Sequence, residues 1–444
     1  MLAFITSLPA AAYVLNVLVS GLLTALAFHK QVTQEVFGGN AFMRKFLIAA
    51  DSSASTLSEL PLHVLALKWI TIQLTHCVGG FGYTLAWLLS YVDYVILGFL
   101  LMLFVESWKE DAVVEEAIKD LAGGDPADTV DSIMSANNVR RILNPIWTPK
   151  DIVMYPNITY ATNEETTEAI ELTNDYDQPR KMALDIYKWS KAPKNSGLRP
   201  VLVHIHGGAW RMGGKGWLYP HEKTLVTEEN WLVVNIGYRL APKNAYPTHL
   251  IDVKRALRYL KKCISAFGGD PNLIVLSGDS AGGHLAAMAA FTANDPQYQP
   301  GFEDADTTVK GVITINGALD VQSDKSRGEY FSHKVALKDK VDPEFLGKHS
   351  PVDLVDKANQ DGLLVPFLVI TGSRDAIVDC SIGRRFKKNY DLALGEKANT
   401  VASQCTLVEL PAAHHICHLS WSPRSIYVSR LIQVWCQLFY NKHK

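Results

Sequence analysis

The sequence predicts an α/β fold, in which a mostly parallel sheet is covered by helices on both faces, behind a helical region at the N-terminus. Two observations predict it. After Pro145, short β-branched apolar runs alternate with helical stretches, which is typical of parallel strands buried on both faces. Before Trp108, the chain holds three long apolar segments with very few charges. At 444 residues, the chain has room for two to three such units.

Composition excludes several other classes of protein. The chain has 43 basic and 45 acidic side chains, a net charge of −2 and 48% hydrophobic residues. The balanced charge argues against a nucleic-acid partner, and the large apolar fraction argues against intrinsic disorder. Six cysteines are too few for a disulfide scaffold in a chain of this length, and none lies in a CxxC pair that would indicate structural zinc.

The N-terminal region, residues 1–108, is predicted to cross a membrane with two to three helices. Its apolar segments are Met1–Phe28, Pro61–Gly80 and Phe81–Val105. Lys68 interrupts the second segment, and Asp93 is the only charge in the third. We therefore expect a multi-pass membrane protein, with a signal peptide as the competing interpretation of the first segment. The charges of the first loop are balanced, so they leave the orientation open.

Asp93 allows two interpretations. A lone carboxylate at mid-membrane is costly and often functional. The favoured alternative is structural, with the carboxyl group protonated or hydrogen-bonded inside a small helical bundle.

The segment between the apolar region and the α/β domain covers residues 109–144. It is rich in carboxylates and then in helix breakers, at Gly123-Gly124-Asp125-Pro126. This pattern predicts a juxtamembrane helix followed by a linker. The α/β domain is then expected to occupy residues 145–444.

Six apolar runs of this domain are predicted to be strands of one sheet. They are Val201–His206, Trp231–Ile236, Leu273–Ser277, Gly311–Ile315, Pro366–Thr371 and Cys405–Leu410. In parallel sheets of this kind, reactive groups lie at the carboxyl ends of the strands. The residues that follow each run are therefore the candidates for a functional site.

A nucleophile is predicted at Ser280. The sequence Gly278-Asp279-Ser280-Ala281-Gly282 has the GxSxG pattern, and it lies between a predicted strand and an apolar helix. Glycines are needed in such a turn because flanking side chains would collide, and the strained turn exposes the serine hydroxyl.

A serine hydroxyl needs a base, and the base needs an orienting acid, in the chain order Ser, Asp, His. Asp375 follows the strand Pro366–Thr371 directly. Asp379 is the alternative acid, but it falls at an expected helix start, where a carboxylate would serve as a cap. After the last strand, His414 and His415 are both candidates for the base.

A metal site at the neighbouring histidines His414, His415 and His418 is the competing interpretation. Neither a third-ligand spacing nor a carboxylate partner accompanies them in the sequence, so we expect no metal and no other cofactor.

An oxyanion hole is predicted after the strand Val201–His206. In His206-Gly207-Gly208-Ala209-Trp210, the glycines allow backbone N–H groups to approach an oxygen closely. Gly207, Gly208 and the residue after the nucleophile, Ala281, are the expected donors. His206 is expected to pin this loop through hydrogen bonds rather than to act as a second base.

The motifs HGGAW and GDSAGGH, together with Asp375 and His415, resemble the hormone-sensitive-lipase-like branch of the α/β-hydrolases. The chain is most similar to membrane-associated carboxylesterases and lipases of the mycobacterial Lip type, over about residues 145–425. The stretches that carry this similarity are Phe267–Pro271, Gly278–His284, Asn294–Pro296, Gln299–Glu303 and Asp306–Val309.

The resemblance also distinguishes the two histidines. In the Lip group, the last motif resembles Glu-Leu-Pro-Gly-Ala-Gln-His followed by Ala-Phe, and its histidine falls on His415. Two departures remain, because His414 occupies the Gln position and Ile416-Cys417 replaces Ala-Phe. Plant-type isoprenylcysteine methylesterases also resemble the chain, in HGGAW and in a membrane-spanning N-terminus, but their serine motif differs.

The resemblance implies an α/β-hydrolase fold and a membrane-anchored serine carboxylic-ester hydrolase. Ser280 would form an acyl-enzyme on a small-molecule or lipid ester, with His415 as base and Asp375 as orienting acid. Two alternatives use the same triad, an amidase or formamidase and an isoprenylcysteine methylesterase-like hydrolase. A non-enzymatic, membrane-tethered scaffold is disfavoured because the chain keeps both nucleophile and base.

Overall fold

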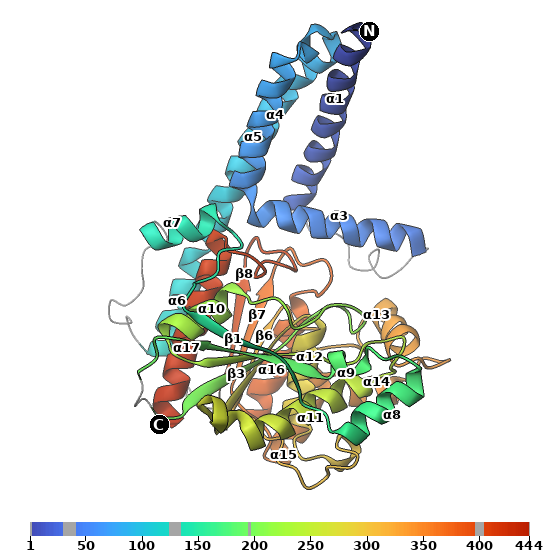
Figure 1. Ribbon diagram of the computed structural model, residues 1–444, viewed down its shortest axis with the longest axis vertical. Helices are drawn as coiled ribbons and strands as arrows, with labels where there is room; N and C mark the ends of the chain where they lie inside the picture. The colour runs from blue at the N-terminus through green and yellow to red at the C-terminus, as the bar shows by residue number, and fades with distance from the viewer. Residues whose placement is uncertain (1, 30–40, 124–134, 194–196, 396–403, 444) are drawn as a thin grey trace.

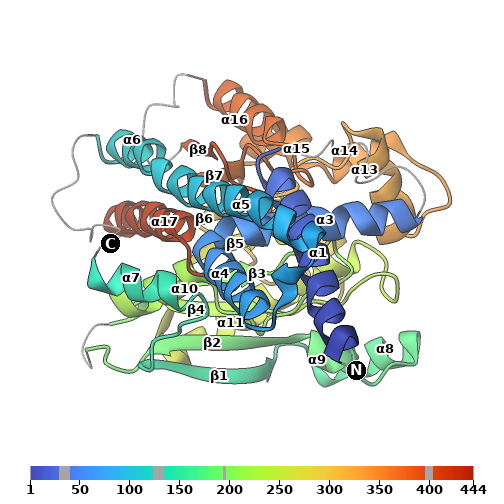
Figure 2. The same ribbon diagram turned by 90° about the horizontal axis from the view of Figure 1, so that it is seen from above.

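A helical bundle stands on one edge of an α/β domain (Figure 1). The computed structural model describes residues 2–29, 41–123, 135–193, 197–395 and 404–443. Seen from above, the bundle and the helix at its foot lie over the α/β domain (Figure 2).

Eight strands form one sheet in the order β1-β2-β4-β3-β5-β6-β7-β8. The strands are β1 (Ile152–Thr159), β2 (Ala183–Trp189), β3 (Arg199–Ile205), β4 (Leu232–Ile236), β5 (Gly269–Asp279), β6 (Gly311–Ile315), β7 (Phe367–Gly372) and β8 (Cys405–Leu410). β1 and β2 are antiparallel, and all pairs from β4 to β8 are parallel. The mostly parallel sheet is therefore confirmed, and the six predicted strands form its parallel part, from β4 to the edge strand β8.

β1 and β2, at one side of the sheet, were not predicted from the sequence. β1 is half-exposed along most of its length and contains Pro156, which lacks a backbone donor. The register of its pairing with β2 also shifts between Tyr155 and Ile158. An edge strand of this kind lacks the continuous apolar run that marks a buried strand.

Helices cover both faces of the sheet. They are α8 (Asn163–Thr173), α9 (Gln178–Lys181), α10 (Pro220–Glu228), α11 (Thr248–Cys263), α12 (Ala281–Phe291), α13 (Lys325–Tyr330), α14 (Pro343–Lys348), α15 (Pro351–Gln360), α16 (Ser381–Leu394) and α17 (Pro423–His443). Alternate residues of a strand face opposite cores. In β3, Val201 and Val203 face the core formed with α11, α12, α15 and α16, whereas Leu202 faces the core formed with α10 and α17.

The N-terminal region contains α1 (Leu2–Ala27), α3 (Ala41–Glu59), α4 (Pro61–Cys77) and α5 (Thr84–Lys109). α1, α4 and α5 form the bundle, and α3 lies across its foot (Figure 1). By length and composition, two helices of the described chain could cross a membrane, Leu8–Ala27 and the stretch Thr84–Ala122 that α5 begins. α4, with 17 residues, is not one of them.

Asp93 lies in a polar cluster inside the bundle. Lys68 of α4 places its ammonium 2.5 Å from Asp93 Oδ1, and Tyr13 of α1 donates its hydroxyl to Oδ2 at 3.0 Å. Lys68 also donates to Asn16 and Ser20 of α1. The structural interpretation of Asp93 is confirmed, and the two charges of the predicted spans prove to be partners.

The segment 109–144 packs against the α/β domain. Its helices are α6 (Asp111–Ala122) and α7 (Ala136–Leu143). Val114, Ile118 and Leu121 of α6 are buried in the same core as α17. α6 therefore contributes to the core of the α/β domain. The sequence had predicted only a helix and a linker outside that domain.

Candidate active site

The nucleophile position is a strained turn between β5 and α12. Ser280 has φ 51° and ψ −118°, a backbone conformation that side-chain-bearing residues rarely adopt and that costs about 1–3 kcal/mol. Its N–H donates to Ile315 O at 3.1 Å, which holds the turn against β6. A Cβ at Gly282 would overlap the Ile205 carbonyl, so only glycine allows α12 to start this close to β3.

Asp375 and His415 are in direct contact. Asp375 follows β7 and is fully buried, and its Oδ2 lies 2.7 Å from His415 Nδ1. Its Oδ1 accepts the N–H groups of Ile377 and Val378 at 2.8 Å each, so the carboxylate is fixed in orientation. This contact leaves His415 Nε2 for other partners. Among the described residues, no hydrogen bond joins Ser280 to His415.

The environment of His415 favours its protonated form. Burial opposes protonation, but the charge and hydrogen bond of Asp375 raise the pKa of His415 above its usual value. Asp379, the alternative acid, accepts the N–H of Ser381 at the start of α16. Asp379 therefore lies in the turn before α16, one residue before the N-cap Cys380, so the expectation that its carboxylate caps the helix is wrong.

The three clustered histidines point to different partners. His415 contacts Asp375, whereas His414 Nε2 lies 2.9 Å from the carbonyl of Ala27. His418 faces Asp279 at 3.8 Å. Burial lowers the pKa of His414 to about 4, so its imidazole is neutral at physiological pH.

The loop after β3 departs from the expected oxyanion hole at one position. Gly207 donates its N–H to Asp279 Oδ1 at 2.9 Å, so this donor is already engaged. Gly208 has φ 120°, and a Cβ there would overlap the carbonyl of Met212. No hydrogen bond to another described residue occupies the N–H of Gly208, Ala209 or Ala281. Ala209, with φ 52°, has an N–H that no described residue occupies, beside that of Gly208, and it was not among the oxyanion-hole donors predicted from the sequence.

His206 has the contacts of a residue that holds the loop. Its Nδ1 lies 2.7 Å from Gly207 O, and its ring stacks on Tyr238 at 4.3 Å between centroids. Burial lowers the pKa of His206 to about 4, which leaves the imidazole neutral. These contacts agree with the predicted pinning role.

Asp279, immediately before the nucleophile, connects the loops of the site. Besides Gly207, its Oδ1 faces His204 Nε2 at 3.3 Å, and His204 Nδ1 lies 3.5 Å from Glu222 Oε1. Burial opposes protonation of His204, but the two carboxylates raise its pKa. A buried imidazole whose protonated form is favoured by two carboxylates therefore lies directly behind the nucleophile turn.

His204, Glu222 and His221 are also the residues whose ligand atoms could hold a metal ion, since these atoms all lie within 4.8 Å of one another. Both ring nitrogens of His221 are buried without a partner among the described residues. However, each nitrogen of His204 already faces a carboxylate, so protonation satisfies this side chain. The geometry therefore fits a proton at His204 at least as well as a metal ion.

Asp51 of α3 is a titratable group of the site that the sequence reading missed. It is 1% exposed and 4.0 Å from His414 Nδ1, and neither of its oxygens has a hydrogen-bond partner within the described ranges. Burial raises the pKa of Asp51 to about 6, and its charge helps to raise the pKa of His415. No motif marks Asp51, because it lies in a segment expected to be a loop between spans.

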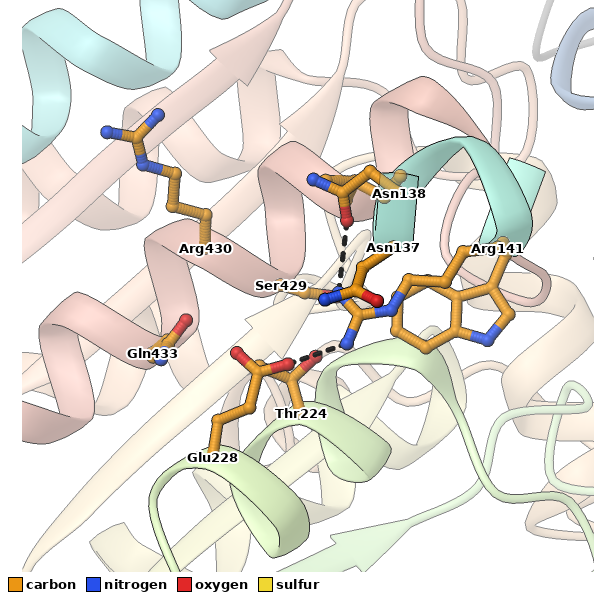
Figure 3. Close-up of a pocket in the computed structure, with 10 residues that line it drawn as sticks. Asn137, Asn138, Arg141, Thr224, Glu228, Ser429, Arg430 and Gln433 are labelled. Atoms are coloured by element: carbon orange, nitrogen blue, oxygen red, sulfur yellow. Dashed lines mark hydrogen bonds and ion pairs between the residues drawn. The ribbon is translucent and has the colours of Figure 1, made fainter. Parts of the chain in front are cut away.

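A separate polar cavity of about 300 Å³ lies between α7, α10 and α17 (Figure 3). Arg141 crosses it, with hydrogen bonds to Asn138 at 3.0 Å and Glu228 at 2.6 Å. Ser280, Asp375 and His415 are not among the residues that line it. This cavity is therefore distinct from the candidate active site.

The chain is similar to known esterases. The BD-FAE family profile matches residues 184–390. Esterase LipQ of Mycobacterium tuberculosis is 35% identical over 59% of this chain and 61% of its own length. The isoprenylcysteine alpha-carbonyl methylesterase ICME of Arabidopsis thaliana is 33% identical over 51% of this chain and 53% of its own. The chain thus spans about half to three fifths of these relatives.

The fold also matches solved structures. Esterase B of Lactobacillus rhamnosis superposes with a TM-score of 0.51 at 19% identity, over 74% of this chain and 98% of that one. The chain has an α/β-hydrolase fold, and its predicted resemblance to carboxylesterases of the mycobacterial Lip type is confirmed.

Proposed function

We propose that the protein is a membrane-anchored carboxylic-ester hydrolase that works through a serine nucleophile. The observation that carries the proposal is the buried 2.7 Å contact of His415 with Asp375, at the same sheet edge as the strained turn of Ser280. The relatives named as esterases support an ester as the substrate.

In the proposed mechanism, Ser280 Oγ attacks the carbonyl carbon of the ester while His415 Nε2 takes the hydroxyl proton. Asp375 holds the imidazole in the required tautomer and stabilises the imidazolium. The same proton then passes to the departing alcohol, which leaves an acyl group on Ser280. Water, deprotonated by His415, attacks this acyl-enzyme and releases the acid.

The oxyanion formed at each step needs N–H donors, and each donor typically contributes about 10²–10³ in rate. We assign this role to Gly208 and Ala281, with Ala209 as a third donor. Gly207 would instead tie the loop to the nucleophile turn through Asp279.

Membrane attachment is proposed to use all three helices of the bundle. α1 and α5 both run toward the α/β domain (Figure 1), so a chain that crosses with both must return through α4. At 17 residues, α4 is at the lower limit for a span, and its Lys68 is neutralised by Asp93. The full-length protein should then stay in the membrane pellet through alkaline carbonate washing.

A second candidate is a methylesterase acting on isoprenylcysteine esters, supported by the relationship to ICME. Purified full-length protein would be assayed on p-nitrophenyl esters of graded acyl length, the matching anilides and an isoprenylcysteine methyl ester, with Ser280→Ala as control. Ester hydrolysis lost in the variant supports the proposal. Cleavage of anilides alone would replace it with the amidase alternative.

A further inference from the structure

The ends of the two longest apolar helices touch the loops of the catalytic acid and base. Ala27, the last residue of α1, accepts hydrogen bonds from His414 at 2.9 Å and from Arg374 at 3.3 Å. Arg374 also donates twice to Glu106, in the last turn of α5, at 2.8 and 2.9 Å. His414 and Arg374 immediately precede His415 and Asp375 in the chain. The C-terminal ends of α1 and α5 therefore contact residues adjacent to the proposed catalytic pair.

α3 contacts the same edge of the domain through polar side chains of its second half. Ser55 accepts the N–H of Ile416 at 3.4 Å, and Glu59 accepts the hydroxyl of Ser422 at 2.7 Å. In the first half of α3, Phe46 is 54% exposed and Ile48 36% exposed. α3 therefore buries apolar residues of its second half, Ala54 and Leu57, in the core of the bundle, but leaves two large apolar side chains of its first half in contact with solvent.

A second apolar patch lies beside the foot of the bundle. The carbonyl of Leu143, at the end of α7, lies 3.3 Å from His63 in the first turn of α4. Leu143 is 68% exposed, and Ile146 close by is 67% exposed. α7 and α3 lie on opposite sides of the bundle foot (Figure 1), so the exposed apolar groups flank the helices on both sides.

We infer that the active site opens at the membrane surface, with α3 in the headgroup layer, and that the ester it takes is one that resides in the bilayer. The inference rests on the proposed function and follows from placement. If α1 and α5 cross the bilayer, they leave it at Ala27 and Glu106, where they contact the catalytic loops. The carbonyl of a membrane ester lies at this depth, while its hydrocarbon chain stays among the lipids.

Spin labelling of the full-length protein in phosphatidylcholine vesicles tests the placement. Single cysteines at Phe46 and Ile48 of α3 would be compared with Leu172→Cys on α8, which is 74% exposed and far from the bundle. Cys77→Ser and Cys263→Ser remove the accessible native thiols. The α3 labels should be several-fold more accessible to oxygen, relative to a water-soluble nickel chelate, than the α8 label. Equal exposure of all three labels to the chelate would overturn the inference.

Kinetics on the same vesicles test the substrate class. At a fixed amount of p-nitrophenyl palmitate, added phosphatidylcholine should slow hydrolysis in proportion to the lowered mole fraction of ester, while p-nitrophenyl acetate is unaffected. A rate of palmitate ester hydrolysis that does not change with added phosphatidylcholine would overturn the inference. If the protein did not hydrolyse p-nitrophenyl acetate at all, the proposed function would be overturned instead. If it hydrolysed the acetate but the α3 labels were as accessible to the nickel chelate as the α8 label, only the inference would be overturned.

Discussion

Ser280 lies in a strained turn between β5 and α12. The first turn of α12 packs so closely on β3 that only glycine fits at position 282, where a Cβ would overlap the Ile205 carbonyl. We predict that Ser280→Ala abolishes labelling by a fluorophosphonate probe, since the attacking oxygen is lost. The variant should unfold at the same temperature as the wild type, because alanine fits the same turn. Labelling that persists in the variant would remove Ser280 from the mechanism.

His414 and His415 are adjacent, but their contacts predict very different consequences of substitution. His415→Ala removes the proton acceptor and should lower kcat by several orders of magnitude. His414→Ala removes only the hydrogen bond to Ala27 O and should lower kcat by about tenfold or less. Steady-state kinetics on one soluble ester compare the two, and the reverse ranking would mean that the base has been misassigned.

Asp51 provides a pH-dependent test at the residue scale. Its negative charge stabilises the His415 imidazolium, whereas catalysis requires the neutral imidazole. Asp51→Asn should therefore lower the pKa of His415 and shift the acid limb of kcat/KM to lower pH, by a fraction of a unit. Ser53→Ala, at an exposed position of the same helix, is the control and should leave the profile in place. A shift to higher pH would contradict the proposed electrostatic coupling.

At the scale of elements, the Arg374–Glu106 ion pair joins α5 to the loop of Asp375. The pair is partly exposed, so its contribution to stability is about 0.2–1 kcal/mol. We predict that Arg374→Gln and Glu106→Gln each lower kcat a few-fold, and that the double variant is no worse than either single one. Arg384→Gln breaks an exposed two-bond pair with Glu409 away from the bundle and should leave kcat unchanged. Additive losses would mean that the two residues act independently.

At the scale of the whole molecule, the N-terminal helices and the α/β domain share a buried charge cluster. Arg424 of α17 is 1% exposed and is paired with Glu59 of α3 and with Glu110, where α5 meets α6. A chain that begins near Asn144 loses both carboxylates, and it also loses α6, whose Val114, Ile118 and Leu121 share a core with α17. We therefore predict that this shortened chain unfolds well below the full-length protein in a thermal melt.

The same cluster offers a second test of this coupling. In the full-length protein, Arg424→Met leaves Glu59 and Glu110 buried without their partner and should lower the melting temperature, whereas in the shortened chain, where both carboxylates are gone, it should have a much smaller effect. If the shortened chain melted at the full-length temperature, the two parts would be energetically independent.

The sequence by itself determined the parallel strands and the candidate triad, because both rest on local signals. β3 to β8 are continuous apolar runs, and the positions of Ser280, Asp375 and His415 follow from which strand each one succeeds. The parallel sheet then brings these strand ends to one edge without any further information.

Only the tertiary structure decided which groups surround the triad. The pairing of Lys68 with Asp93, the engagement of Gly207 by Asp279 and the position of Asp51 beside the histidine loop join residues far apart in the chain. No local pattern encodes such contacts, because they depend on how α3 and the bundle pack on the finished domain. The identity of the candidate catalytic residues thus follows from the order of strands and motifs in the sequence. The protonation of these residues, the rigidity of their loops and the proposed access of the ester depend on how the helices pack on the domain.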